Sequence, residues 1–180
     1  MTPSRVNQEQ SRFPYELYLL RHGAAVKAAE ASFSRDFQRP LTVEGAEKVR
    51  KIGEGLKRLG VSPDWIVTSP LLRAVQTADI LATILTPAFP VSSSDTLRPG
   101  RSAEGLVAVL AGHPERRKVL AVGHDRDLTH LAARLIGSNE DARLTLKKGG
   151  CCLITLAEIP PASFGQLVWW ATPRILRGIS

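Results

Sequence analysis

The sequence predicts an α/β fold: a single domain with a mostly parallel central sheet, helices on both faces and a C-terminal hairpin. Short apolar runs typical of buried strands alternate along the chain with stretches whose apolar residues recur at helical spacing. The length of 180 residues is close to that of one domain. Two apolar runs near the C-terminus are joined through Pro160, Pro161 and Gly165, which favours the hairpin.

The expected strands are short apolar runs bounded by loop residues. Those that should form the main part of the sheet are residues 16–20, 65–68, 91–94 and 119–122, and those of the hairpin are residues 151–157 and 166–171. The run at 119–122 is the clearest buried strand, and it leads directly into Gly123 and His124.

Capping residues and glycines mark several ends of the expected helices. These cover residues 43–59, 70–85, 103–111 and 127–136, with Ser102 as the cap of the third and Gly137 at the end of the fourth. Thr42 is expected to cap the first and Gly60 to end it, while Ser69 and Pro70 provide an N-cap and a first-turn proline for the second. Arg73 therefore falls in the first turn of that second helix.

The domain organisation follows from the same pass along the chain. Residues 1–14 are polar and are expected to form a flexible N-terminal tail, and residues 15–180 to form the one folded domain. No internal repeat, low-complexity tract or second boundary interrupts this range.

The formal net charge of +7 indicates an anionic substrate rather than a nucleic acid. The basic residues are scattered, with no long run and no nucleic-acid recognition motif beside them. No apolar run approaches the roughly 20 residues needed to span a bilayer, so no membrane association is expected.

Two adjacent cysteines, Cys151 and Cys152, fall in an expected strand. Their side chains should point to opposite faces, so a disulfide between them would be strained. A reducing cytoplasm fits such thiols, and the residue spacing offers no zinc site or other metal site.

Four basic side chains follow the ends of expected strands. Arg21 and His22 follow the first strand, Arg73 lies just after the second, and His124 follows the run at 119–122. Because ligands bind outside the carboxyl ends of strands in such sheets, we expect these residues to converge on one site.

The chemistry of that set is phosphoryl transfer. Guanidinium groups of Arg21 and Arg73 offer charged, planar forks for phosphoryl oxygens, and a neutral imidazole such as that of His22 is a good nucleophile near pH 7. His124 would donate to a nonbridging oxygen. Each residue alone also has a structural interpretation, as a surface ion pair or an ordinary strand exit, so the prediction depends on the joint pattern.

The motifs that carry these residues resemble those of the histidine phosphatase superfamily, with the phosphoglycerate-mutase-like fold. The resemblance runs from about Glu16 to Arg177 and includes the segments Leu20-Arg21-His22-Gly23, Pro40-Leu41-Thr42 with Gly45, Thr68-Ser69-Pro70 through Arg73 to Gln76-Thr77-Ala78, and Val122-Gly123-His124. The short length, Lys147-Lys148-Gly149-Gly150 and the closing Trp169, Trp170, Thr172 and Pro173 resemble the phosphohistidine phosphatases of SixA type.

This resemblance implies a mechanism and a substrate. His22 would be the phosphorylated nucleophile, with Arg21, Arg73 and His124 as the phosphate pocket and no cofactor. The substrate would be phosphohistidine on a protein, such as a phosphotransfer signalling protein in the cytoplasm. The resemblance leaves the partner and the oligomeric state open.

The sequence departs from relatives that cleave sugar phosphates, because it lacks their conspicuous glutamate motif. Asp95 and Glu104 lie near the expected place and are the candidates for a general acid. Histidine is a good leaving group once it is protonated, whereas a leaving alkoxide needs a proton delivered in the transition state. A site without a strong general acid therefore favours phosphoramidates as substrates. Arg126 stands where relatives of the type that acts on phosphoramidates often have proline. It adds charge at the pocket rim, either to recruit a substrate or as part of the solvated surface.

Three functions therefore stay open at this point. The first is a protein phosphohistidine phosphatase. The second is a phosphatase of small molecules such as sugar phosphates or nucleotides, and the third is a non-catalytic phosphate-binding module.

Overall fold

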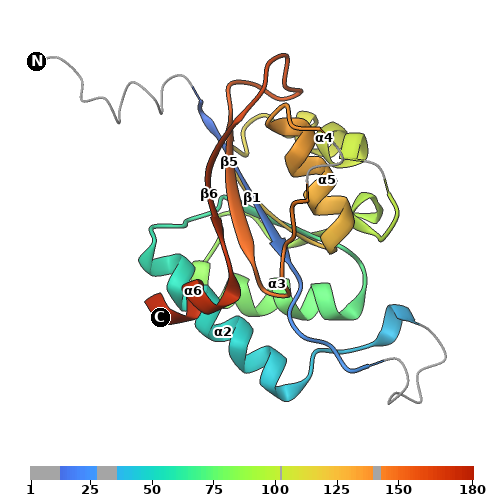
Figure 1. Cartoon of the computed structure of the whole chain (residues 1–180), viewed down its shortest axis with the longest axis vertical. Coiled ribbons are helices and arrows are strands. Elements are labelled where there is room, and N and C mark those ends of the chain that lie inside the picture. Colours follow the sequence, from blue (N-terminus) through green and yellow to red (C-terminus); the bar gives the residue numbers. More distant parts are fainter. Residues whose placement is uncertain (1–12, 28–35, 102, 140–142) are drawn as a thin grey trace, which may run out of the picture.

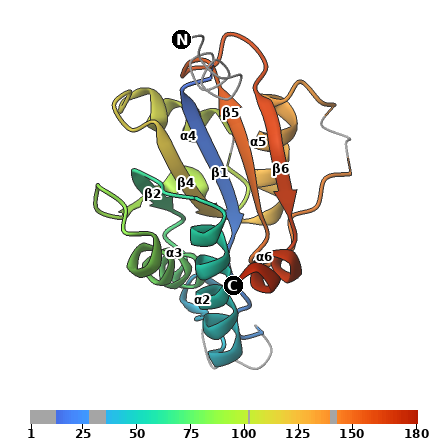
Figure 2. The ribbon, with the colours of Figure 1, turned by 90° about the vertical axis from the view of Figure 1, so that its left-hand side faces the viewer.

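The strands lie in one mixed sheet at the centre of the molecule. The structure, a computed structural model, describes residues 13–27, 36–101, 103–139 and 143–180. Within those residues the strands are β1 (Tyr15–Arg21), β2 (Trp65–Thr68), β3 (Ser92–Ser93), β4 (Lys118–Gly123), β5 (Cys151–Leu156) and β6 (Gln166–Ala171). Their order across the sheet is β3-β2-β4-β1-β5-β6, most of which can be followed in Figure 2.

The pairing of the strands confirms a mostly parallel sheet with a C-terminal hairpin. β1, β2, β3 and β4 pair in parallel. β5 runs antiparallel to both β1 and β6. Strand β1 thus lies between parallel β4 and antiparallel β5. Its carboxyl end lies at the same edge of the sheet as those of β4 and β2. These two strands precede the other predicted site residues.

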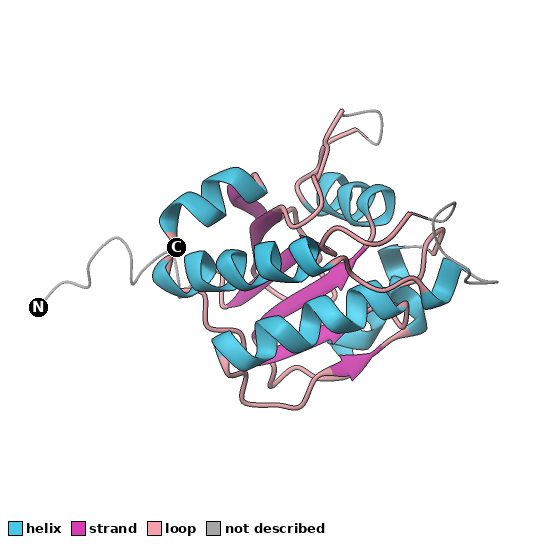
Figure 3. Ribbon diagram, turned by 90° about the horizontal axis from the view of Figure 1, so that it is seen from below, coloured by secondary structure: helices cyan, strands magenta, loops and turns pink. Residues whose placement is uncertain are grey.

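Helices cover both faces of the sheet, as expected. The helices are α2 (Val43–Arg58), α3 (Leu72–Leu85), α4 (Ala103–Ala111), α5 (Asp125–Leu135) and α6 (Pro173–Ile179), with short 3-10 turns η2 (Asp36–Gln38) and η3 (Asp95–Leu97). Figure 1 shows α4 and α5 on one side of the sheet and α2, α3 and α6 on the other, and Figure 3 shows long helices lying across the strands. Within the described ranges, no helix is long and apolar enough to cross a membrane.

The core consists of two apolar layers separated by the sheet. One contains side chains of α4 and α5, such as Leu106 and Leu131, and the other contains side chains of α2 and α3, such as Leu56 and Leu81. Cys152 belongs to the first layer and Cys151 to the second. The two thiols therefore point to opposite faces as predicted, and both are free.

Some expected helix boundaries were correct and others were wrong. The Thr42 hydroxyl accepts from the Gly45 amide at 2.9 Å and caps α2, and Gly60 adopts a left-handed φ of +80° after it. Ser69 is not the N-cap of α3, because α3 begins at Leu72 after an extended Leu71. Ser69 instead continues the β2 pairing through its amide, which donates to the Val122 carbonyl at 2.9 Å.

Two other helices differ from the expectation. α5 begins at Asp125, two residues before the predicted start, so that His124 is its N-cap residue. α6 was not predicted, although Thr172 followed by Pro173 is a helix-start signal: the Thr172 hydroxyl accepts from the Ile175 amide at 3.4 Å. Of the expected N-terminal tail, residues 1–12 lie outside the described residues, as does Ser102, the expected cap of α4.

Candidate active site

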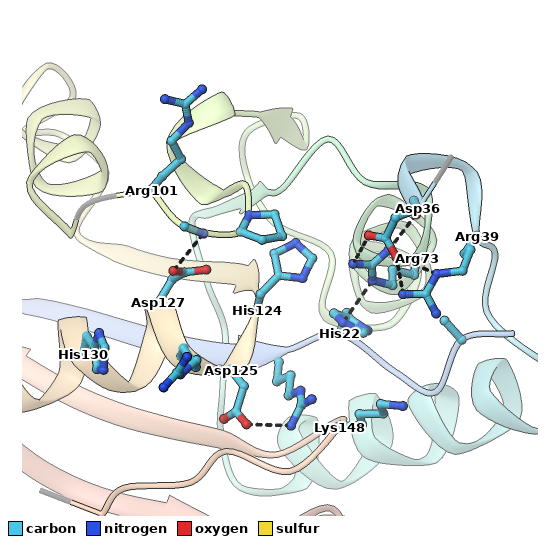
Figure 4. A pocket seen from close by; sticks show the side chains of 15 residues that line it. His22, Asp36, Arg39, Arg73, Arg101, His124, Asp125, Asp127, His130 and Lys148 are labelled. Carbon is cyan, nitrogen blue, oxygen red and sulfur yellow. Dashed lines mark hydrogen bonds and ion pairs between the residues drawn. The ribbon is translucent and has the colours of Figure 1, made fainter. Parts of the chain in front are cut away.

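The four basic residues singled out from the sequence line one pocket. It lies at the carboxyl ends of β1, β2 and β4 and has a volume of about 1000 Å³. Arg21 ends β1 and His22 follows it, Arg73 comes from the first turn of α3, and His124 follows β4. Figure 4 shows the two histidines side by side in this pocket, and their ring centroids are 5.1 Å apart.

The His22 ring is held as a neutral imidazole whose Nε2 is unprotonated. Its Nδ1 lies 2.7 Å from the Gly23 carbonyl oxygen, which can only accept, so Nδ1 carries the proton. Nε2 accepts from the Arg73 Nε at 3.1 Å. Burial lowers the pKa of His22 to about 3, aided by the neighbouring His124 and the two arginines and opposed by the bond to Gly23. At neutral pH this nitrogen is therefore unprotonated.

Arg73 is held on both sides of its guanidinium group. It is 4% exposed, and besides donating to His22 it donates from Nη1 to the Asp36 carbonyl and from Nη2 to the Asp36 carboxylate, each at 3.0 Å. Asp36 also accepts from the Arg39 Nε at 2.7 Å. Burial by itself would raise the pKa of Asp36, but the hydrogen bonds from Arg39 and Arg73 outweigh it and lower that pKa.

His124 is fixed from the opposite side of the pocket. Its Nε2 lies 2.9 Å from the Ser69 hydroxyl oxygen, which also accepts from the Leu71 amide at 3.4 Å. Burial lowers the pKa of His124 to about 4, with a further lowering from Arg73 and Arg21 that Asp36 partly offsets. His124 is therefore neutral near pH 7 and has one ring N–H to donate.

Arg21 is anchored at one end of its guanidinium group. Nη1 donates to the Asp125 carboxylate and to the Leu146 carbonyl, both at 2.9 Å. Its Nε is buried and has no hydrogen-bond partner among the described residues. A buried donor without a partner is costly, and an oxygen of a bound anion would satisfy it.

The loop after His22 is positioned by α2 and α3. The Gly23 amide donates to the Thr77 hydroxyl at 3.1 Å, and the Leu41 amide donates to the Gln76 side chain at 2.8 Å. A Cβ on Gly23 would lie 2.5 Å from a methyl group of Val49, so only glycine fits this close approach. The Gln76-Thr77 pair of the sequence motif thus holds the nucleophile's loop.

Of the two carboxylates expected as general acids, only Asp95 has a described side chain, and that side chain does not reach this pocket. Asp95 lies in η3, its carboxylate is 73% exposed and pairs with the Arg98 Nε at 2.9 Å, and it does not line the pocket. Glu104 lies in α4, but its side chain falls outside the described residues.

Sequence reasoning missed Asp36, Arg39 and Asp127, which all line the pocket. Asp127 accepts from the Gly100 amide at 3.1 Å, and burial raises its pKa despite that bond and the nearby His130 and Arg126. Asp36 and Arg39 directly precede the Pro40-Leu41-Thr42 motif, and Asp127 lies three residues after His124. Closeness to these motifs was the available signal.

The comparisons with known proteins agree with this architecture. The family model of the histidine phosphatase superfamily (branch 1) matches residues 17–99. An uncharacterised protein of Picosynechococcus sp. is 38% identical over 141 residues, which are 75% of this chain and 81% of that protein. The chain therefore belongs to the histidine phosphatase superfamily.

Two further likenesses indicate the range of activities in this superfamily. A 2,3-bisphosphoglycerate-dependent phosphoglycerate mutase of Bifidobacterium longum is 41% identical over 66 residues, but these span only 37% of this chain and 27% of the mutase. The solved structure of the protein histidine phosphatase SixA complexed with tungstate has a TM-score of 0.78 at 24% identity, and covers 89% of this chain and 99% of SixA. Membership thus identifies a phosphatase or a mutase, and the SixA likeness shows the shared fold.

Proposed function

We propose that the protein is a phosphatase that hydrolyses phosphohistidine on a protein, through a covalent phosphohistidine formed on His22. The observation that carries the proposal is the state of His22. Its Nε2 is unprotonated and accepts a hydrogen bond from the Arg73 Nε at 3.1 Å, and the ring lies beside His124 in a pocket of arginines. This is the arrangement that a nucleophile attacking a phosphoryl group requires.

In the first step, the His22 Nε2 attacks the phosphorus atom as the P–N bond of the substrate breaks. Arg21, Arg73 and His124 donate to the nonbridging oxygens, whose negative charge they stabilise. The second ring nitrogen of the substrate histidine takes up a proton from solvent, and the imidazole departs as neutral histidine. In the second step, water attacks phosphorus, the bond to His22 breaks, and inorganic phosphate leaves with His22 restored. We propose no metal or other cofactor for these steps, because the arginines supply the positive charge.

The preference for phosphohistidine is supported by the carboxylates that line the pocket. Asp36 is ion-paired with Arg73, and the hydrogen bonds from Arg39 and Arg73 lower its pKa, so it is a poor proton donor near pH 7. A protonated imidazole is a good leaving group without such a donor. The SixA-like fold further supports a phosphotransfer signalling protein as the substrate. The two free thiols support a location in the cytoplasm.

A second candidate function, a phosphatase of small molecules such as sugar phosphates, is favoured by Asp127. This carboxylate lines the pocket and its pKa is raised, as a general acid requires. The similarity to a phosphoglycerate mutase over part of the chain points the same way. Under this function, Asp127 would protonate the leaving alkoxide.

Rates with different leaving groups distinguish the two candidates. Purified protein is assayed with phosphohistidine, an aryl phosphate and a sugar phosphate, in the presence of a chelator. We expect phosphohistidine to be hydrolysed fastest, the aryl phosphate more slowly and the sugar phosphate slowest. Asp127→Asn, Asp95→Asn and Glu104→Gln should each retain phosphohistidine turnover within about tenfold, or about 1.4 kcal/mol in the barrier.

The opposite pattern would select the small-molecule function. Fast hydrolysis of a sugar phosphate that falls a hundredfold in Asp127→Asn would identify that residue as a general acid. Loss of turnover in chelator that added metal restores would instead contradict the proposed chemistry. A protein that binds vanadate but turns over none of the three substrates would be a phosphate-binding module.

A further inference from the structure

The pocket extends well beyond the residues that would hold a phosphoryl group. Its volume of about 1000 Å³ is at the upper end of the range for pockets that take drug-sized ligands. The phosphoryl group needs only the floor, where His22, Arg73 and His124 lie. The remaining space is lined by side chains at the mouth, which can contact whatever carries the phosphoryl group.

Among the described residues, three basic residues at the mouth, here called the basic rim, have no counter-ion. Arg101, Arg126 and Lys148 are exposed and line the pocket, and no hydrogen bond or ion pair of their side chains occurs among the described residues. The arginines of the floor differ, because Arg21 pairs with Asp125 and Arg73 with Asp36. Within the part of the chain that the structure describes, the side chains of the rim are thus not held in ion pairs and can contact a bound partner.

The rim residues come from three separate segments around the pocket. Arg101 lies in the loop before α4, Arg126 in the first turn of α5, and Lys148 in the loop before β5. Figure 4 shows Arg101 and Lys148 on opposite sides of the two histidines. Such cations surround the mouth rather than converge on one point, which suits several separate anionic groups better than one.

Arg126 is unfavourable for the helix in which it lies. A cation in the first turn opposes the helix dipole, whereas the flanking Asp125 and Asp127 complement it. Arg126 lies near enough to the Asp127 carboxylate to act toward lowering its pKa, although the two side chains do not form an ion pair. A residue that costs helix stability at the mouth of the pocket is expected to have a role in binding.

We propose that the basic rim binds carboxylate side chains that flank the phosphohistidine on an acidic partner protein. This inference rests on the proposed function and specifies its substrate class. Positive charge around a cleft raises the local concentration of an anionic partner and speeds its association, and salt screens the effect. A protein surface with several carboxylates around the phosphorylated side chain matches the spread of the three cations.

The test compares two phosphohistidine peptides of equal length, one with Asp and Glu around the phosphohistidine and one with Ser and Gln. The measured quantity is the ratio of their kcat/KM values in wild type and in the triple variant Arg101→Gln/Arg126→Gln/Lys148→Gln. A matched control, Arg50→Gln/Lys51→Gln/Lys57→Gln, removes the same charge from exposed positions of α2 that do not line the pocket.

We expect wild type to prefer the acidic peptide by about tenfold at low salt, with the ratio falling toward one at high salt. The rim variant should lower the ratio to about one, and the control should keep it. Equal rates with both peptides in wild type would overturn this inference, and so would a control variant that loses the preference as fully as the rim variant. Neither result would contradict the proposed function. Hydrolysis of a sugar phosphate with neither peptide cleaved would overturn the proposed function itself.

Discussion

The Asp36 carboxylate pairs with Arg73, one of the residues that we propose to bind the phosphoryl oxygens. Its contacts at 3.0 Å place a negative charge next to the proposed position of a negatively charged substrate. Its neighbour Arg39 offsets part of that charge. Asp36 thus has two opposing effects, since it orients Arg73 and also repels the phosphoryl group.

The first prediction is that Asp36→Asn strengthens the binding of inorganic phosphate or vanadate. The amide retains an oxygen that can accept from Arg73, and the backbone carbonyl contact is unchanged. The removed charge should lower the inhibition constant by about fivefold, or about 1 kcal/mol. Asp79→Asn, at an exposed position of α3, is the control and should leave the constant unchanged. Weaker anion binding in Asp36→Asn would mean that orientation of Arg73 is the larger effect.

At the same scale, the sequence was informative about residues at strand ends and uninformative about their partners. Arg21, His22, Arg73 and His124 were predicted to converge because each follows a recognisable strand. The partnership of Asp36 with Arg73 depends on a loop far away in the sequence, and no local pattern encodes that contact.

At the scale of elements, the packing of the loop after β1 against α2 limits what can follow His22. The second prediction is that Gly23→Ala destabilises the protein by about 1 to 3 kcal/mol, because its Cβ would overlap the side chain of Val49. Urea unfolding measures the change in the free energy of unfolding. Val49→Ala removes the obstructing methyl groups, so in the double variant the cost of Gly23→Ala should be smaller than in wild type. Additive effects of the two changes would rule out this contact as the cause.

The element boundaries show where the sequence pattern was overridden. The capping rules predicted the start of α2 correctly at Thr42, whose hydroxyl accepts from the Gly45 amide and donates to the Ala24 carbonyl. The same rules failed at Ser69, whose amide continues the pairing of β2; α3 begins only at Leu72. α5 begins earlier than expected, at Asp125. Its N-cap residue is His124, whose side chain makes no capping bond.

At the scale of the whole molecule, two buried neutral histidines make stability depend on pH. In the unfolded chain a histidine binds a proton below about pH 6.5, but in the folded protein only near pH 3 for His22 and near pH 4 for His124. Between these values the unfolded state binds more protons than the folded state. The stability that the neutral rings allow is therefore fully present above about pH 6.5 and is lost as the pH falls toward 4.

The third prediction is a steep loss of stability in acid. Each histidine should add a slope of up to about 1.4 kcal/mol per pH unit between about pH 6 and pH 4.5. Urea unfolding at pH 7, 6 and 5 measures it for wild type, for His22→Gln/His124→Gln and for His130→Gln, whose ring is exposed. The double variant should lose less stability over this range than wild type, and His130→Gln should lose as much. Equal losses in all three proteins would show that the buried rings do not titrate as described.

The covalent step on His22 is tested most directly by single-turnover trapping. Excess protein is mixed with a peptide whose phosphohistidine carries radioactive phosphate and is quenched with alkali within milliseconds. The account predicts label on the protein in an acid-labile, base-stable linkage, present in wild type and absent in His22→Ala. His124→Ala should still be labelled, at a rate lower by about a hundredfold or more because one donor to the transition state is lost. Label that persists in His22→Ala, or peptide hydrolysis at the wild-type rate in that variant, would contradict the account.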